Sequence, residues 1–422
     1  MHRAARFVSQ WEWLILLLLI PLLMFSSGWL YLLLLVIPFL WIVRRIGTGH
    51  FISPTPYDVL LVIMLLMVLV SLYATFDITL SIPKIAGVVL GIALFYTAVA
   101  ATREHDHGIW YLVGFILLAG TGMAAIGFLG VNWPGPLAPL NDLLASLPGL
   151  FRTIPGAIGG VINPNELAGV MCWIIPLLAA LVFGLGRDLW HGKKLLLLLL
   201  LGMLAFTTVI LLGSQSRGGI GAVLGAFFIM LAVSKRWGRI LLVAALLAVV
   251  FLFFYFGLDT LLTDSSSASD AIGIDGRLEI WSRALYGLAD FPFTGMSMNG
   301  FRRVVHILYP LFLVAPDTDL GHAHNQLLQA GLDLGIPGLI SYLGIWLLSA
   351  ALLYKSWQPL KSHPQHALVI GISGALAAGW LFGLLDAIAL GARPGFIWWL
   401  LLAVAVALFD QAVRLNQSNS PA

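Results

Sequence analysis

Residues 194–221 read KLLLLLLLGMLAFTTVILLGSQSRGGIG, and this stretch indicates how the whole chain is built. Residues 194–213 are apolar over a length that crosses a bilayer as a helix, which takes about 20 residues. The turn that follows, residues 214–216, is only long enough to reverse the chain. Arg217 then begins the descending span, and its glycines allow close approach by a ligand or a neighbouring helix. The stretch therefore predicts antiparallel membrane-spanning helices with a cation at one face.

Composition places the chain in a membrane. Of its 422 residues, 60% are hydrophobic and 10% are charged. A soluble domain averages about 25% charged residues, and a chain this apolar cannot hide its surface from water. The composition excludes a soluble globular protein and predicts an all-α, polytopic membrane protein.

Twelve apolar runs are candidates for membrane-spanning helices. They cover residues 13–27, 29–43, 57–76, 83–101, 109–131, 160–184, 194–213, 218–234, 239–257, 337–354, 366–388 and 392–410. The first two are short, so residues 13–43 form either two full spans or one broken element. The predicted organisation is membrane helices 1–9 in residues 1–257, a long outer loop with short amphipathic helices in residues 258–336, and helices 10–12 with a tail in residues 337–422.

Basic residues orient the predicted bundle. With both termini in the cytoplasm, the inner segments hold 14 of the 22 Lys and Arg residues, as the positive-inside rule favours. The remaining eight fall on the outer side: Lys84, Arg152, Arg217, Arg277, Arg283, Arg302, Arg303 and Arg393. Most of these are arginines, whose planar fork suits phosphate or carboxylate. The distribution predicts an anionic ligand at the outer face.

The stretch GHAHNQLLQAGLDLGIPG, Gly321 to Gly338, carries the candidate chemistry. Asp319 or Gly321 is expected to cap a short helix over residues 322–334, which Gly335 ends. His324 then falls in the first helical turn, where the positive end of the helix dipole favours a neutral imidazole. A neutral histidine beside arginines is what a general base for hydroxyl attack requires. His324 is therefore the predicted catalytic base.

Two arginines at predicted helix starts are the candidate ligands for an anion. Arg217 and Arg277 both oppose the helix dipole, and a bound anion shared with the free backbone N–H groups relieves that penalty. A headgroup-facing arginine is the alternative interpretation. Glu279 lies beside Arg277 and is expected to be its ion-pair partner or a solvated charge.

Residues 163–166, Asn-Pro-Asn-Glu, open a further helix. Asn is a good N-cap and Pro fits the first turn, so capping explains most of this motif. Glu166 lies at the edge of the hydrocarbon layer, where a carboxylate needs a partner or a wet cavity. Asn165 and Glu166 are therefore candidate supporting residues.

A metal site is the rival interpretation of the histidine stretch. Asp317 and Asp319 form a D-x-D that precedes the H-x-H of His322 and His324, and such a cluster can hold a divalent ion. The abundance of outer arginines argues against a cation. No metal and no cofactor are therefore expected, and the role of the two aspartates stays open.

These motifs resemble a known family. His324-Asn325, nine residues, Gly335, two residues and Gly338 are similar to the H-[NSQ]-x9-G-x-x-G signature of bacterial O-antigen ligases. The SQSRGG turn at Arg217, the GRLEIW element at Arg277 and the NPN motif at residues 163–165 also look like that superfamily. The likeness covers most of residues 150–340 in motif order.

The resemblance implies a GT-C-type glycosyltransferase of the bacterial inner membrane with a periplasmic active site. It implies metal-independent transfer of a glycan from undecaprenyl pyrophosphate to a sugar hydroxyl of lipid A–core. The matching positions are His324 as base, with Arg217 and Arg277 on the pyrophosphate. Arg152 is included as a further pyrophosphate ligand, with His322 and Asn325 in support. The expected partners are the lipid-linked donor, the glycan acceptor and membrane lipids, and no nucleic acid.

Several functions share this pattern. A repeat-unit polymerase uses the same donor with another lipid-linked glycan as acceptor, and a protein O-oligosaccharyltransferase uses a polypeptide. A transporter for a polyprenyl-linked glycan is the non-enzymatic alternative, but transporters place charges near the midplane and show repeated halves. A single visible base favours direct transfer with inversion. The sequence leaves the sugars, the choice of ligase or polymerase, and the oligomeric state open.

Overall fold

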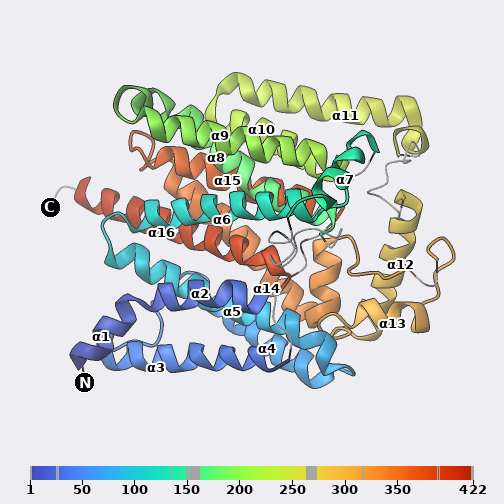
Figure 1. Cartoon of the computed structure of the whole chain (residues 1–422), viewed down its shortest axis with the longest axis horizontal. Coiled ribbons are helices and arrows are strands. Elements are labelled where there is room, and N and C mark those ends of the chain that lie inside the picture. The colour runs from blue at the N-terminus through green and yellow to red at the C-terminus, as the bar shows by residue number, and fades with distance from the viewer. Residues whose placement is uncertain are drawn as a thin grey trace.

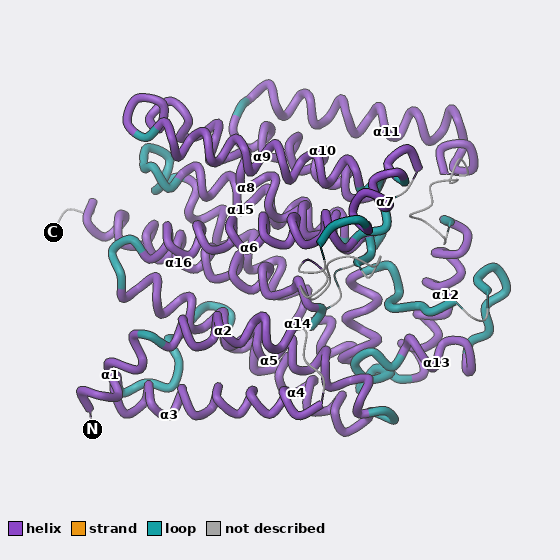
Figure 2. The backbone as a smooth tube through the Cα atoms, viewed as in Figure 1, coloured by secondary structure: helices purple, strands orange, loops and turns teal. Residues whose placement is uncertain are grey.

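The computed structural model describes residues 2–24, 28–133, 135–148, 151, 162–262, 273–315, 318–386, 388 and 390–419. Helices make up the regular structure of these residues, and the one β-bridge among them joins Val131 to Ile162 (Figure 2). A helix satisfies its backbone hydrogen bonds within its own segment, which is what a chain in lipid requires. The predicted all-α, polytopic membrane class is confirmed.

The helices follow one another along the chain. The N-terminal half contains α1 (His2–Gln10), α2 (Glu12–Met24), η1 (Gly28–Leu35), α3 (Val36–Thr48), α4 (Asp58–Ala74), α5 (Ile78–Glu104), α6 (Gly108–Gly130), η2 (Gly135–Leu137), α7 (Pro139–Ala145), α8 (Pro164–Gly192) and α9 (Lys194–Gly213). The C-terminal half contains α10 (Arg217–Ser234), α11 (Arg236–Leu262), α12 (Ile274–Asp290), α13 (Phe301–Leu308), α14 (Gln326–Trp357), α15 (His366–Phe382), η4 (Arg393–Gly395) and α16 (Phe396–Asn419).

Eight helices in the described part of the chain are long and apolar enough to cross a membrane. They are Tyr31–Thr48, Ile78–Glu104, Gly108–Gly130, Pro164–Gly186, Lys194–Gly213, Arg217–Ser234, Gln326–Trp357 and Arg393–Ser418. Two shorter apolar helices, α4 and α15, have 17 residues each. Each of the twelve predicted runs overlaps a helix, and among the described residues eight helices qualify by length and composition. The N-terminal region differs most, because the described residues between 13 and 43 belong to α2, a 3₁₀ segment and α3, and only Tyr31–Thr48 qualifies as a span there.

The long helices lie roughly side by side (Figure 1). The central helices are α5, α8 and α16, whose side chains are mostly buried. α8 packs against α9 and α15, and α16 packs against α5 and α14. Both chain ends lie at one end of this bundle, and α12 and α13 lie at the opposite end (Figure 1). The bundle thus has one end with the termini and one end with the segment that holds the histidine stretch.

The segment before α14 has a small core of its own. α11 continues to Leu262, so the described part of this segment begins later than the predicted residue 258. Ile280 of α12, Phe301 of α13 and Leu332 of α14 pack together and are buried. This second core fixes α12 and α13 against the start of α14, and so it holds the elements that carry the predicted site.

α14 is broken at Gly335, as the sequence predicts. Gly335 has φ +68° and ψ −178°, and a side chain there would collide with the carbonyl of Phe293. The loop before α13 crosses α14 at this break. Met296 N–H donates to the carbonyl of Leu332 at 2.6 Å, and Ile336 N–H donates to that of Pro292 at 2.7 Å. The signature glycine is therefore required because a second backbone approaches the helix there.

Candidate active site

The histidine stretch is a tight loop that ends at the start of α14. Asn325 is the N-cap, since its side-chain Oδ1 accepts from the N–H groups of Leu327 and Leu328 at 2.9 and 3.1 Å. The predicted cap at Asp319 or Gly321 is wrong, and so is a helix that begins at His322. His324 lies before the helix, in a left-handed conformation with φ +49°. Such backbone strain in a non-glycine residue is often found at functional sites.

The same loop is joined to the end of α15. Asn325 Nδ2 donates to the carbonyl of Leu384 at 3.1 Å, and the backbone N–H of Gln326 donates to that of Gly383 at 2.7 Å. A side chain at position 383 would collide with the Gln326 carboxamide, so glycine is needed for this approach. These two bonds bring Asp386, two residues after Leu384, to the histidines.

His322, His324 and Asp386 form a compact triad. Asp386 Oδ1 lies 3.3 Å from His324 Nδ1 and 3.5 Å from His322 Nε2. The two imidazole rings have their centres 4.5 Å apart. The three side chains are largely buried, with exposed fractions of 24% for His322, 18% for His324 and 9% for Asp386.

The backbone fixes the proton on His322. The N–H of His324 donates to His322 Nδ1 at 3.1 Å, so Nδ1 carries a lone pair and the proton of the neutral ring is on Nε2, which faces Asp386. Burial is the largest influence on His322 and lowers its pKa to about 4. The Asp386 carboxylate opposes this shift, and Lys84 and Arg277 add to it. His322 is therefore neutral at neutral pH, with its Nε2 on the side of Asp386.

A carboxylate lies beside the ring of His324 and can orient it. Its Nδ1 faces Asp386, and the 3.3 Å contact is not aligned as a hydrogen bond in this conformation. Such contacts commonly tighten when substrate binds. With the Nδ1 proton directed at Asp386, Nε2 keeps its lone pair and can accept a proton from an incoming hydroxyl.

A buried network of polar side chains holds the loop that carries the two histidines. The N–H of Ala323, between the two histidines, donates to Gln329 Oε1 at 2.8 Å. Gln329 Nε2 donates to Asp333 Oδ1 at 2.9 Å, and Lys84 Nζ lies 3.3 Å from Asp333 Oδ2. Asp333 also accepts from the N–H of Asn299 at 3.0 Å. The network links α5, α14 and the loop before α13, and it fixes the backbone that positions both imidazoles.

The predicted arginines occupy two different helix starts. Arg217 is the first residue of α10 and is exposed, and the Ser216 side chain caps this helix by accepting from the N–H of Gly219 at 3.3 Å. Arg277 lies in the first turns of α12 and within electrostatic range of His322. Arg152 lies outside the described residues. The structure thus puts Arg277 within electrostatic range of His322, and it puts Arg217 at the helix start that the sequence predicts.

The residues after Asn163 also behave as expected. Asn163 caps α8 by accepting from the N–H of Asn165 at 2.8 Å, and Pro164 is the first helical residue. Glu166 lies in the first turn of α8, within electrostatic range of Arg393 and Asp386.

Glu279 has a different role from the predicted one. Its two carboxylate oxygens accept from the N–H groups of Phe312 and Leu313 at 2.7 and 2.8 Å, and one oxygen lies 3.5 Å from Arg283. The described contacts make it the anchor of a loop and a partner of Arg283. The sequence predicts Arg277 or solvent as the partner of Glu279, whereas its described partners are the loop amides and Arg283.

Asp319 also pairs with a residue outside the histidine stretch. It forms a two-pronged ion pair with Arg302 on α13, which holds the pKa of the Asp319 carboxyl below its usual range. Asp317 lies outside the described residues. Among the described residues, the group that could hold a metal ion is instead the triad, whose three potential ligand atoms lie within 4.8 Å of one another. Two imidazoles and a carboxylate are suitable zinc ligands, so chelation is an informative test.

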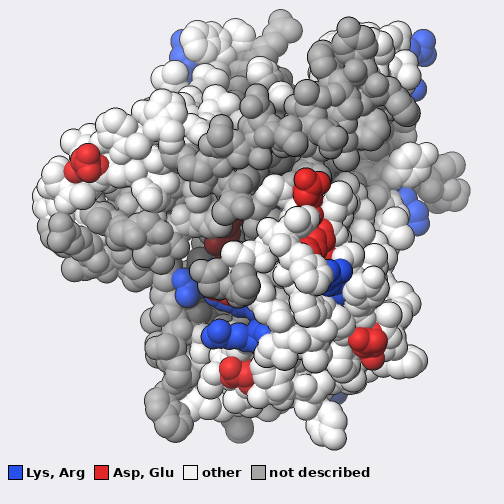
Figure 3. Space-filling view, turned by 90° about the vertical axis from the view of Figure 1, so that its right-hand side faces the viewer, with Lys and Arg blue, Asp and Glu red and all other residues white. Residues whose placement is uncertain are grey.

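The end of the molecule opposite the termini is hollowed. Figure 3 shows basic side chains gathered beside a hollow near the middle of this face, with an acidic side chain visible inside it. Positive charge around a recess is the arrangement that attracts an anionic ligand.

Asp386 is the residue that sequence reasoning missed. It was counted inside the apolar run 366–388, although a carboxylate near the end of a membrane helix is itself a functional signal. Lys84 was recognised as an outer cation without its partner Asp333. Both partners are distant in sequence, and no local pattern connects them.

Two comparisons bear on these residues. Residues 202–343 match the family model described as O-antigen ligase, a segment that contains Arg217, Arg277 and His324. A comparison with curated proteins gives no match. The resemblance predicted from the sequence is confirmed over the matched segment.

Proposed function

On the premise that residues 202–343 form an O-antigen ligase domain, we propose that the chain is a membrane glycosyltransferase. It takes a glycan from undecaprenyl pyrophosphate and joins it to a sugar hydroxyl of lipid A–core. The observation that carries this proposal is the 3.3 Å approach of His324 Nδ1 to Asp386, with Arg277 within electrostatic range of the same cluster. An oriented imidazole beside a cation is what this transfer needs.

In the proposed reaction the acceptor oxygen attacks the anomeric carbon of the donor glycan. Its proton passes to Nε2 of His324, and Asp386 stabilises the imidazolium that forms. The bond between the anomeric carbon and the pyrophosphate oxygen breaks, and undecaprenyl pyrophosphate leaves with the electron pair. Arg217 and Arg277 neutralise the leaving group together with the N–H groups at the starts of α10 and α12.

The proposal has three further parts. Direct attack proceeds with inversion and needs no covalent intermediate, since one base and a set of cations suffice. The proposal puts the active site at the periplasmic face of the inner membrane and both termini in the cytoplasm. The position of the site and the termini at opposite ends of the bundle supports opposite sides for them (Figure 1). Twelve crossings and a GT-C-type architecture belong to the same proposal.

The test is a transfer assay with purified protein, a polyprenyl-pyrophosphate glycan and separate acceptors. Transfer to lipid A–core is expected. Transfer only to a second lipid-linked glycan would make the chain a polymerase, and transfer only to a polypeptide would make it a protein O-oligosaccharyltransferase. Donor translocation in proteoliposomes without transfer to any acceptor would overturn the enzymatic proposal in favour of a transporter.

Stereochemistry provides a second test of the mechanism. NMR of the new linkage, with a donor of known anomeric configuration, is expected to show inversion. Intact-mass analysis of enzyme with donor alone is expected to show no added glycan. Retention, or a protein mass raised by one glycan, would require a side-chain nucleophile and would direct attention to Glu166.

A further inference from the structure

A groove runs along the half of the bundle that is farther from the candidate active site. α15 forms its floor and packs against both α10 and α14, which form its walls. Its volume is about 860 Å³, which is within the range of ligand-binding pockets, and its walls are mostly apolar. Because α10 and α14 are both long and apolar enough to cross a membrane, this groove faces lipid.

The groove has the length of one leaflet of a bilayer. On α14 it extends from Trp346 to Trp357, which is about 16 Å of helix at about 1.5 Å per residue. The hydrocarbon core of a bilayer is about 30 Å thick, so the groove covers about half of it. Leu347 and Tyr354 line the groove and are nevertheless 71% and 82% exposed. The groove is therefore open to the side, and its length matches the acyl chains of a single leaflet.

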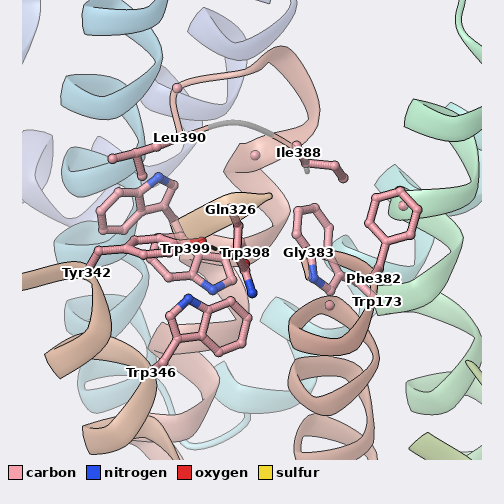
Figure 4. Close-up of a pocket in the computed structure, with 14 residues that line it drawn as sticks. Trp173, Gln326, Tyr342, Trp346, Phe382, Gly383, Ile388, Leu390, Trp398 and Trp399 are labelled. Atoms are coloured by element: carbon pink, nitrogen blue, oxygen red, sulfur yellow. Dashed lines mark hydrogen bonds between the residues drawn. The ribbon is translucent and has the colours of Figure 1, made fainter. Parts of the chain in front are cut away.

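A cluster of aromatic rings closes the end of the groove that is nearer the candidate active site. The ring of Trp346 lies 5.3 Å from that of Trp380 and 5.7 Å from that of Trp398. Figure 4 shows Trp346 and Trp398 beside the Gln326 carboxamide, whose Nε2 donates to the carbonyl of Trp380 at 3.1 Å. The cluster therefore separates the groove from the loops that carry the triad.

The other end of the groove is basic. Arg239, near the start of α11, lines it and donates from Nε to the carbonyl of Ala232 at 3.2 Å. The two terminal nitrogens of this guanidinium carry further N–H donors. Lys235 and Arg236 precede it where α10 passes into α11, and Lys355 lies in the last turn of α14. A phosphate at this end of the groove would therefore meet several cations.

The helices around the groove supply no carboxylate to balance these cations. Residues 217–258 and 334–385 include every residue that lines the groove, and they contain no Asp or Glu. Arg103, at the same end of the bundle, has such a partner, because its Nε lies 2.8 Å from Asp410 Oδ2. The excess positive charge at the groove is complementary to an anionic headgroup.

We propose that this groove binds an anionic glycerophospholipid. An acyl chain lies between α10 and α14 on the floor that α15 forms, and the headgroup phosphate contacts the Arg239 guanidinium. Basic pockets between membrane helices bind such headgroups, and the planar fork of arginine matches phosphate oxygens. A polyprenyl tail has no charge to match Arg239, and the aromatic cluster separates the groove from the triad. The proposal is independent of the reaction at the triad.

The test is native mass spectrometry of the purified chain in detergent after lipid removal. The protein is titrated with phosphatidylglycerol, which is anionic, and with phosphatidylcholine of the same acyl chains, which has no net charge. We expect the phosphatidylglycerol complex to form at the lower lipid concentration. Equal affinity for the two lipids, or no complex with either, would overturn the proposal.

Arg239→Gln tests the contact with the headgroup. The preference for phosphatidylglycerol should fall roughly fivefold or more, which is the contribution of about one basic residue at an anionic lipid surface. Arg236→Gln is the matched control, since it removes the same charge three residues earlier from a position that does not line the groove. The control should keep the preference of the parent protein. Equal losses in the two variants would indicate general attraction to a basic surface and would overturn the site.

Ala350→Trp tests the position of the acyl chain. Ala350 lines the groove, so a large ring at this position should fill the groove and weaken the binding of both lipids. Ala351→Trp is the matched control, because Ala351 is exposed and does not line the groove. Equal binding by these two variants would contradict an acyl chain in the groove. If Ala350→Trp fails to fold, the parent protein and the Arg239 and Arg236 variants still decide the proposal.

The lipid that accompanies the protein from the cell identifies the alternative occupant. Native mass spectrometry before lipid removal should show an anionic phospholipid that Arg239→Gln loses. A polyprenyl phosphate that Ala350→Trp removes and Ala351→Trp retains would assign the groove to a polyprenyl tail, and it would overturn the phospholipid site.

Discussion

His324 Nδ1 lies 3.3 Å from Asp386 Oδ1, although the two residues are at opposite ends of the segment that contains α14 and α15. His324 directly precedes α14, and Asp386 follows α15. The two helices are consecutive, so the start of the first and the end of the second come together when the chain reverses between them. The hydrogen bonds from Asn325 and Gln326 to residues 383 and 384 then fix the separation.

Asp386→Asn should lower turnover by roughly 10²–10⁴-fold while donor binding stays close to that of the parent, because the amide no longer favours the required tautomer or stabilises the imidazolium. The measurement separates kcat from donor affinity. Asp290→Asn is the matched control, since Asp290 accepts from the Tyr309 hydroxyl at 2.6 Å on α12, away from the triad. Equal turnover in the two variants would remove Asp386 from the mechanism.

His324→Ala should lower transfer by roughly 10²–10⁴-fold, the usual cost of losing a general base. Folding and membrane insertion should persist, because the backbone N–H that bonds to His322 is retained. The control is His306→Ala, whose ring contacts the carbonyl of Thr318 at 3.0 Å. Near-normal turnover by a well-folded His324→Ala protein would contradict the assignment.

Arg217→Lys and Arg277→Lys should each bind the donor more weakly and transfer slowly, since lysine keeps the charge but loses the planar fork. Direct titration with donor and initial rates would measure both effects. Arg303→Lys, on α13, serves as the control for charge-conserving change at this end of the molecule. If both test variants match the control, the two arginines are outer-face anchors and do not bind pyrophosphate.

Activity should survive EDTA, because arginines and helix starts can neutralise the leaving group without an ion. Loss of activity in chelator that one divalent ion restores would contradict this expectation. In that event the ligands would be His322, His324 and Asp386, whose potential ligand atoms lie within 4.8 Å of one another.

The depressed pKa of His322 predicts a loss of stability in acid. The unfolded imidazole titrates near 6.5, whereas the folded one has a pKa of about 4. Because the unfolded state binds the proton first, the free energy of unfolding falls as pH drops from about 6.5 toward about 4, by at most about 3 kcal/mol for the full shift. Thermal unfolding of parent and His322→Gln across this range tests the assignment. The variant should depend less on pH, and identical pH profiles would count against it.

The sequence by itself determined the class of the protein and several local features. Long apolar runs can only be buried in lipid as helices, so the all-α membrane class followed from composition. Asn163 at the start of α8, Arg217 at the start of α10 and the break at Gly335 followed from rules that involve neighbouring residues only. The histidine motif indicated the family, and the match over residues 202–343 agrees with it.

Only the tertiary structure decided which charged groups meet. His324 meets Asp386, and Lys84 meets Asp333. Glu279 accepts from the amides of Phe312 and Leu313. In each pair the two partners are far apart in the chain. For Glu279 the partners also lie in a loop that has no periodic sequence pattern. Helix packing and backbone bonds such as Gln326 to Gly383 set these distances, and local propensity carries no information about them. Helix starts could be predicted because their hydrogen bonds are local, whereas the triad depends on how α14 and α15 return to the same end of the bundle.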